Sequence, residues 1–299
     1  MNFNQTYKNA ALAGAGFMVA GGAIYALINV ATQYLTSSMG LASTSMAFWQ
    51  YFIAFVALLP WLKYADLRNL KSQQLTLQII RVIFSALGVQ CWIYALANGV
   101  PIWQAIALLM TSPFFVTLAA ALWLKEPVGF PRISATFIGF VGGMIILEPW
   151  SDEFQLIALL PVAAAAFWAG ASILVKQLSY TESASSITLY LLLLLTPINA
   201  GLAVIDGFSL PTLDMVWLLL AVGVLTAVAQ GAYAMAYKAA DAVYVQPFDH
   251  VKLPLNIVAG AVVFGWAPTG NLWLGATLII GSSLFIMYRE HKRHVALPA

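Results

Sequence analysis

Two oppositely charged side chains stand three residues apart inside a long apolar stretch of the sequence. Asp249 and Lys252 lie in the segment from Gln246 to Asn256, and the runs on either side of it are apolar. A charge at the centre of a bilayer costs roughly 2.5–3.5 kcal/mol on insertion scales, so both groups are expected to face protein or water and to pair. Such groups can contact a zwitterionic or polar solute, and Asp249 can take up a coupling proton while Lys252 keeps its charge. The plainer alternative is an ion pair that only neutralises itself between two packed helices.

Helical geometry groups further polar residues with this pair. At 100° per residue, one broad face of a helix would carry Gln246, Asp249, Lys252, Leu253 and Asn256, with His250 turned aside. Pro254 has no N–H to donate to the carbonyl of His250, and its ring crowds that turn. We therefore expect a kink beside the charges, with neighbouring groups satisfying the freed carbonyl.

The composition places these residues in a membrane protein. Of 299 residues, 62% are hydrophobic and 8% are charged, whereas soluble domains have about 25% charged residues. The single cysteine, Cys91, excludes an intramolecular disulfide and a cysteine-based metal site. The three histidines form no metal-ligand pattern with carboxylates, and there is no phosphate-binding loop or nucleophile elbow. We expect no cofactor, no catalytic site and no nucleic-acid partner.

A hydropathy window of about 20 residues predicts an all-α integral membrane protein with ten transmembrane helices. The predicted spans are Ala11–Tyr34, Ser43–Leu62, Leu75–Asn98, Ile102–Leu124, Arg132–Leu147, Gln155–Leu178, Ser186–Ile205, Met215–Tyr237, Ala242–Phe264 and Asn271–Tyr288. The connections between them are short, so no soluble domain of any size is expected.

The basic residues predict the orientation of these spans. With the N-terminus inside, one side collects Lys8, Lys63, Arg68, Lys71, Arg81, Lys125, Arg132, Lys176, Lys238, Arg289, Lys292 and Arg293. The connections on the other side carry acids such as Asp152 and Asp206 and no Lys or Arg. By the positive-inside rule, both termini are cytoplasmic, and we expect a multi-pass protein of the inner cell membrane.

The two halves of the chain also match each other. A shift of 141 residues aligns Pro113 with Pro254 and Pro127 with Pro268 without a gap. The predicted repeats are residues 1–150 and 151–299, each with five spans. Because five is odd, the second repeat would enter the membrane inverted, an arrangement typical of secondary transporters that work by alternating access. Pro113 and Pro254 would then be matching hinges.

Three stretches resemble the ten-helix EamA-type transporters of the drug/metabolite transporter superfamily. The first carries an Arg, a Tyr-Ala-Leu and a Pro-Phe-Phe, at Arg81, Tyr94 and Pro113, followed by Leu-Lys-Glu-Pro at 124–127. The second is Gln-Pro-Phe-Asp-His-Val-Lys-Leu-Pro at 246–254, and the third is the small-residue helix at 273–281. The resemblance covers nearly the whole chain and implies a transporter fold without fixing the solute.

The sequence also departs from the family's pattern. Gln50 stands where the second helix often carries Arg, which weakens any anion-binding role at that position. The segment Phe264–Pro268 lacks the Glu expected in the second repeat, and His250 replaces the common Tyr. These differences argue against assigning this chain a solute by analogy.

The resemblance implies a central cavity lined by the first, third, fourth, sixth, eighth and ninth helices. Aromatic residues there would offer flat walls to a ring-bearing solute or a cation, and the candidates are Tyr25, Tyr94, Trp103, Trp168 and Tyr233. Gln104 and Asn29 are the polar candidates outside the ninth span. The alternative for each of these residues is an interhelical hydrogen bond or a place in the aromatic belt at the membrane surface.

We therefore predict a secondary transporter, exporter or importer, of a small organic metabolite such as an amino acid, a nucleoside-like or vitamin-like solute, or a drug. Its partners would be that solute and the lipid bilayer, with a coupling proton as well if Asp249 takes one up, and the protein would be a monomer or a weak dimer. The alternative is an intramembrane enzyme or a sensor on the same helical scaffold.

Overall fold

The computed structural model describes residues 3–62, 72–123, 130–152, 154–240, 242–266, 268 and 270–296, and its regular secondary structure over these residues is helical. The long helices are α1 (Phe3–Gln33), α2 (Ser43–Leu62), α3 (Leu75–Ala97), α6 (Phe130–Leu147), α7 (Leu160–Leu178), α8 (Ala184–Ile205), α9 (Leu213–Ala239) and α12 (Gly270–Ala296). The shorter elements are η1 (Tyr34–Ser38), α4 (Ile102–Leu109), α5 (Ser112–Trp123), η3 (Leu156–Leu159), α10 (Ala242–Val245), η4 (Gln246–Val251) and α11 (Lys252–Phe264).

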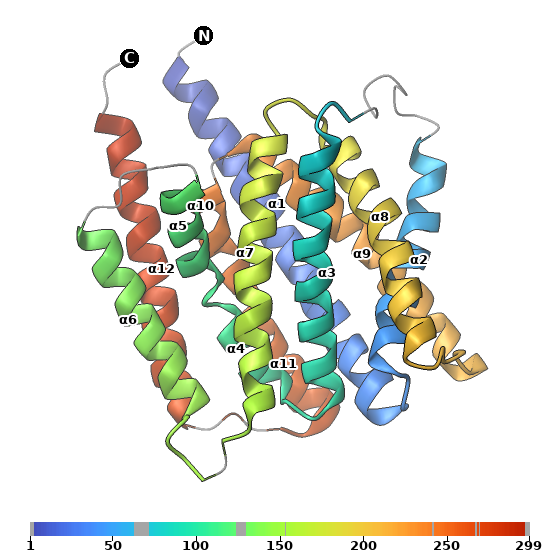
Figure 1. Ribbon diagram of the computed structural model, residues 1–299. Helices are drawn as coiled ribbons and strands as arrows, with labels where there is room; N and C mark the ends of the chain where they lie inside the picture. Colours follow the sequence, from blue (N-terminus) through green and yellow to red (C-terminus); the bar gives the residue numbers. More distant parts are fainter. Residues whose placement is uncertain are drawn as a thin grey trace.

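The helices run side by side and form one bundle (Figure 1). The two termini lie at the same end of this bundle, together with the connection between α7 and α8 (Figure 1). The connection between α6 and α7 lies at the opposite end, so the first half of the chain finishes on the side away from both termini (Figure 1).

Seven stretches within the described residues are long and apolar enough to cross a membrane. They correspond to the first four predicted spans and to the sixth, seventh and eighth. The fifth and tenth predicted spans are shorter apolar helices, Ile133–Leu147 and Gly270–Ile286. The ninth is divided among α10, η4 and α11. The prediction of an all-helical chain rich in apolar spans is therefore confirmed for the part that the structure describes.

The fourth and ninth spans are interrupted where the sequence predicts kinks. Pro113 is the second residue of α5, and Pro254 is the third residue of α11. A proline in the first turn of a helix removes an N–H that has no acceptor there in any case. The chain therefore accommodates both prolines by ending one helical segment and starting another, rather than by bending a continuous helix.

The bundle is built from helices that are far apart in the sequence. α1 packs along α9, α3 along α7, and α6 along α12, while α2 contacts both α8 and α9. The start of α2 also meets the α8–α9 connection, since Thr44 Oγ1 donates to Asp206 Oδ2 over 2.8 Å and Ser209 N donates to Ser45 Oγ over 2.9 Å.

Several residues that bear on the predicted orientation and repeat lie outside the described residues. They are Lys63, Arg68, Lys71, Lys125 and Pro127. Support for the orientation and for the second proline match therefore comes from the sequence alone.

Candidate functional site

A cavity of about 1020 Å³, its open side included, lies between the helices around the charged segment of η4. Sites for small organic molecules are concave and largely apolar with a few polar groups, and they often lie between the helices of a bundle, as this cavity does. Its lining comprises Met18, Tyr25, Asn29, Tyr51, Arg81, Ser85, Leu109, Met110, Ser112, Pro113, Trp168, Ala171, Ser172, Val175, Leu191, Leu195, Gln230, Tyr233, Ala234, Tyr237, Gln246, Asp249, His250 and Lys252. Polar and aromatic groups thus share the wall with aliphatic ones.

The charged pair lies in this wall. Lys252 Nζ is 2.5 Å from Asp249 Oδ2, and both side chains are about nine-tenths buried. The segment Gln246–Val251 is a 3₁₀ helix, in which residues three apart lie in line. This geometry places Gln246, Asp249 and Lys252 on a narrower strip than the α-helical face that the sequence predicts.

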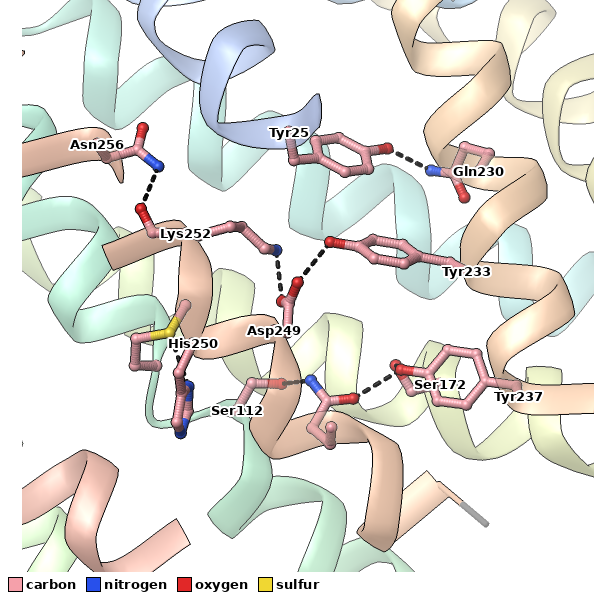
Figure 2. Close-up of polar contacts among 12 residues, drawn as sticks. Tyr25, Ser112, Ser172, Gln230, Tyr233, Tyr237, Asp249, His250, Lys252 and Asn256 are labelled. Carbon is pink, nitrogen blue, oxygen red and sulfur yellow. Dashed lines mark hydrogen bonds and ion pairs between the residues drawn. The ribbon is translucent and has the colours of Figure 1, made fainter. Parts of the chain in front are cut away.

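Two stacked tyrosines close one side of the pair. The rings of Tyr25 and Tyr233 have centroids 5.3 Å apart and planes 14° apart, and Lys252 Nζ lies 5.4 Å from each centroid. Tyr233 donates from its hydroxyl to Asp249 Oδ1 over 2.6 Å, and Gln230 donates to the Tyr25 hydroxyl over 2.7 Å (Figure 2). The ammonium group is therefore held by one carboxylate and two aromatic faces.

Glycine makes room for this stack on α1. A Cβ atom at Gly21 would lie 2.6 Å from Cε1 of Tyr233. Any larger residue at that position would push the Tyr233 ring away from Tyr25 and Asp249.

A second polar chain runs beside the pair. The Tyr237 hydroxyl donates to Gln246 Oε1 over 2.6 Å and lies 2.9 Å from Ser172 Oγ (Figure 2). Gln246 Nε2 in turn donates to Ser112 Oγ over 3.3 Å. These hydroxyl and amide groups come from α5, α7, α9 and η4, and each can exchange its partner for a hydroxyl of a bound solute.

His250 points to a different part of the wall. Its Nδ1 lies 2.8 Å from Met110 Sδ, and its buried Nε2 has no hydrogen-bond partner among the described residues. Asn256 is fully buried outside the cavity lining and donates from Nδ2 to the carbonyl of Lys252 over 2.8 Å.

Arg81 and Glu182 form a polar cluster at the end of the bundle where the termini lie. Glu182, between α7 and α8, accepts from Gln78 Nε2 over 2.8 Å, from Ser186 Oγ over 2.9 Å, and also from Ser72 Oγ. Burial alone would raise the pKa of Glu182, but these hydrogen bonds outweigh burial and hold the pKa below its usual value. Arg81 Nη1 donates to Gln78 Oε1 over 3.0 Å and to the carbonyl of Ile187 over 2.8 Å.

The structure brings together most of the residues that the sequence singles out. Asp249, Lys252, His250, Gln246, Trp168, Asn29, Tyr25, Tyr233 and the hinge candidate Pro113 line one cavity. Tyr94, Trp103, Gln104, Asn256 and the hinge candidate Pro254 are not part of the lining. Tyr94 is 50% exposed on the outer surface of α3, and Gln104 makes a long contact of 3.5 Å with the carbonyl of Ile146.

Seven polar residues of the lining are not among the candidates from the sequence, namely Tyr51, Arg81, Ser85, Ser112, Ser172, Gln230 and Tyr237. Arg81 counts among the basic residues of the cytoplasmic side in the predicted orientation, although a basic residue that falls inside a predicted span is itself a signal. Gln50 bonds to Thr226 Oγ1 over 3.0 Å and lies outside the cavity lining.

Comparisons with known proteins converge on one family. The model of the EamA-like transporter family matches residues 12–148 and again residues 155–288. A riboflavin transporter of Vibrio cholerae is 52% identical over 288 residues, covering 96% of each chain. A riboflavin transporter of Rhizobium johnstonii is also 52% identical, covering 95% of this chain and 93% of that one.

More distant relatives extend the comparison. An S-adenosylmethionine uptake transporter of Rickettsia bellii is 28% identical over 264 residues, covering 88% of this chain and 89% of that one. A solved crystal structure superposes with a TM-score of 0.68 at 14% identity, covering 97% of this chain and 99% of that one. At that identity the superposition speaks for a shared fold alone.

Proposed function

The chain belongs to the EamA-like transporter family, and from that premise we propose that its solute is riboflavin or a close flavin relative. The family makes the protein a multi-pass membrane transporter of a small organic metabolite and not an enzyme, as the sequence predicts. The observation that carries the flavin proposal is the 52% identity, over nearly the full length, to relatives named riboflavin transporters.

The chemistry of the cavity supports this solute. Riboflavin joins a flat, uncharged ring system to a chain of hydroxyl groups. Trp168 and the stacked pair Tyr25 and Tyr233 offer aromatic faces to the ring. The chain formed by Gln246, Tyr237 and Ser172 offers donors and acceptors to the hydroxyl groups.

The charges of the cavity argue against S-adenosylmethionine, the solute named for the Rickettsia relatives. That solute carries a positively charged sulfonium group. Here the wall of the cavity already holds two cations, Lys252 and Arg81, against the carboxylate of Asp249. A cationic solute would meet an excess of positive charge.

Transport by purified protein in proteoliposomes tests this proposal. We expect saturable movement of riboflavin, competed by unlabelled riboflavin and not by S-adenosylmethionine. Movement of S-adenosylmethionine with no movement of riboflavin would contradict the flavin assignment and leave the family membership intact.

We further propose that ten spans form two inverted five-helix repeats, residues 1–150 and 151–299, which exchange between outward-open and inward-open states. The pairing of helices supports this arrangement, because α1 packs along α9 as α7 packs along α3, and each pair maps onto the other under the repeat. The matching interruptions before Pro113 and Pro254 support it as well. In this scheme α5 and α11 swing about those interruptions.

Replacing Pro113 and Pro254 with Ala together should slow turnover several-fold while solute affinity stays near that of the wild type. Alanine restores the N–H that a continuous helix would bond to the carbonyl four residues earlier, at Leu109 and at His250, so the helical segments can join and the hinge is lost. Pro113 lines the cavity, and alanine keeps a Cβ atom at that position in the wall. Transport rates and binding should be measured on the same preparation. Pro197→Ala is the matched control, because Pro197 is exposed inside α8 and lies outside the cavity lining. Equal rates for the double variant and the control would refute a hinge role.

We place the protein in the inner cell membrane with both termini in the cytoplasm. Reporter fusions after Gly40 and after Gly207 are expected to report the outside, and fusions after Ser183 and at the C-terminus to report the cytoplasm. The reason is the excess of Lys and Arg on the side of the termini. A cytoplasmic signal after Gly40 would contradict both the orientation and the inverted repeats.

A further inference from the structure

Arg81 is a buried cation whose hydrogen-bonding capacity is not used up by the protein. Its side chain is 3% exposed and lines the cavity. Its bonds to Gln78 and Ile187 both leave from Nη1, and its buried Nε has no acceptor among the described residues. Guanidinium groups present five N–H donors in a fixed plane, so donors remain for a ligand on the cavity side.

The charges around Arg81 indicate what that ligand should offer. Glu182 is the acid whose charge acts on Arg81, and its oxygens already accept from Ser72, Gln78 and Ser186. The carboxylate of Asp249 already pairs with Lys252 and accepts a hydrogen bond from the Tyr233 hydroxyl. Arg81 is therefore suited to a solute group rich in acceptor oxygens.

The face of α3 that carries Arg81 is shaped for a flat body. Arg81, Ser85 and Gly88 stand at i, i+4 and i+7, so they lie along one face, spanning about 10 Å. Ser85 lines the cavity, and the indole of Trp168 packs against Gly88, where a Cβ atom would lie 2.5 Å from its Nε1. The strip thus has a donor group at one end, small residues in its middle and an aromatic ring at the other end.

We propose that Arg81 binds the carbonyl-bearing edge of the flavin ring, while the methylated benzene end of the ring lies toward Trp168. This inference rests on the proposed flavin solute and deepens it by fixing the orientation of the ring. In a flavin the C4 carbonyl oxygen and the ring nitrogen N5 lie side by side, and both accept hydrogen bonds, so this edge of the ring matches the guanidinium fork. Arg81 is then a specificity-determining residue that contacts the solute.

Quenching of flavin fluorescence by purified protein tests the assignment with three ligands. Riboflavin has the ring and the ribityl chain, lumiflavin has the ring without the chain, and 6,7-dimethylquinoxaline lacks the pyrimidine ring and is followed by competition. Arg81→Met should weaken riboflavin and lumiflavin equally, by roughly 10- to 100-fold, and leave the weak competition by the quinoxaline unchanged. Arg81→Lys should restore part of the affinity at most, because it keeps the charge and loses the fork.

Lys176→Met is the matched control. Lys176 bonds to the carbonyls of Tyr237 and Ala240 and is not part of the cavity lining, so its loss should leave the affinity ratios of the three ligands unchanged. If Arg81→Met does not fold, competition on the wild-type protein still tests the orientation of the ring. Lumiflavin should then compete well with riboflavin, and the quinoxaline should compete only weakly.

Three results would overturn the assignment. Unchanged flavin affinity in Arg81→Met would give Arg81 a structural role only. A loss confined to riboflavin would mean that Arg81 contacts the ribityl chain instead of the ring edge, and an equal loss for all three ligands would mean a general distortion of the cavity. Failure of the wild type to bind riboflavin at all would contradict the proposed function itself, and this inference would fall with it.

Discussion

Exchanging Asp249 for Asn and Lys252 for Met in one chain should give a protein that folds and inserts but transports no solute. The pair lies in the wall of the cavity and is about nine-tenths buried. Replacing a buried ion pair by uncharged groups of similar size is often neutral or stabilising, because the cost of removing two charges from water disappears. The introduced asparagine could still accept from the Tyr233 hydroxyl, and the introduced methionine would fill the space beside the two tyrosine rings.

The loss of transport follows from what the double variant removes. Lys252 lies over the faces of Tyr25 and Tyr233, and Asp249 receives the Tyr233 hydroxyl. The pair therefore fixes the aromatic wall that a flat solute would contact, and Asp249 is the carboxylate that could carry a coupling proton. Fixing the aromatic wall and carrying a proton both require the charges, whereas the packing of the helices does not.

The single variants and a control make the test decisive. Asp249→Asn alone or Lys252→Met alone leaves an unpaired buried charge, which costs about 3–5 kcal/mol, so each should be less stable than the double variant and also inactive. Asp206→Asn changes a carboxylate that accepts from Thr44 on another part of the bundle and should transport like the wild type. Thermal unfolding and proteoliposome transport should be measured in parallel. If the double variant transports the solute like the wild type, the pair only joins packed helices and has no role in transport.

The sequence predicts the charged centre well because the physical rule is strict. Charged residues in an apolar span are expensive, so Asp249 and Lys252 stand out without any knowledge of their neighbours. Their environment in the structure, with a 2.5 Å contact between them, agrees with the expectation that they pair. The aromatic candidates Tyr25 and Tyr233 also follow from helix position, although their stacking joins α1 to α9 and could not be foreseen.

The remaining parts of the site depend on contacts between distant segments. Gln230 bonds to Tyr25 across 205 residues, and Tyr237 meets Ser172 across 65 residues. Single-sequence periodicity gives the face of one helix and not the partner opposite it. The sequence also treats Gln246–Val251 as α-helical, because the switch to a 3₁₀ helix is set by the packing of that segment and not by its composition.

Replacing Gly275 with Ile should prevent the protein from folding to a stable state, whereas the same change at Gly281 in the same helix should be tolerated. A Cβ atom at Gly275 would lie 2.5 Å from the backbone oxygen of Gly142 and 2.4 Å from Cγ1 of Ile146. In the opposite direction, a Cβ atom at Gly142 would lie 2.6 Å from the oxygen of Gly275. α6 and α12 thus touch backbone to backbone, and no change of rotamer can make room.

The expected loss exceeds the about 1–3 kcal/mol of ordinary overpacking, because the atoms in the way belong to the main chain. Close approach through small residues is also what holds helices together in a membrane, where apolar side chains gain little by meeting each other instead of lipid. Gly281 is exposed and has open space around it, so Ile there should face lipid without a clash. Size-exclusion profiles and thermal unfolding in detergent give the comparison, and equal stability of the two variants would contradict it.

This contact also bears on the site, because α12 packs against α10 and η4. Moving α12 away from α6 would shift the segment that carries Gln246, Asp249 and His250. Gly275→Ile should therefore lose transport together with stability, whereas Asp249→Asn with Lys252→Met should lose transport while stability remains. The two variants separate the geometry that positions the charged segment from the chemistry that this segment performs.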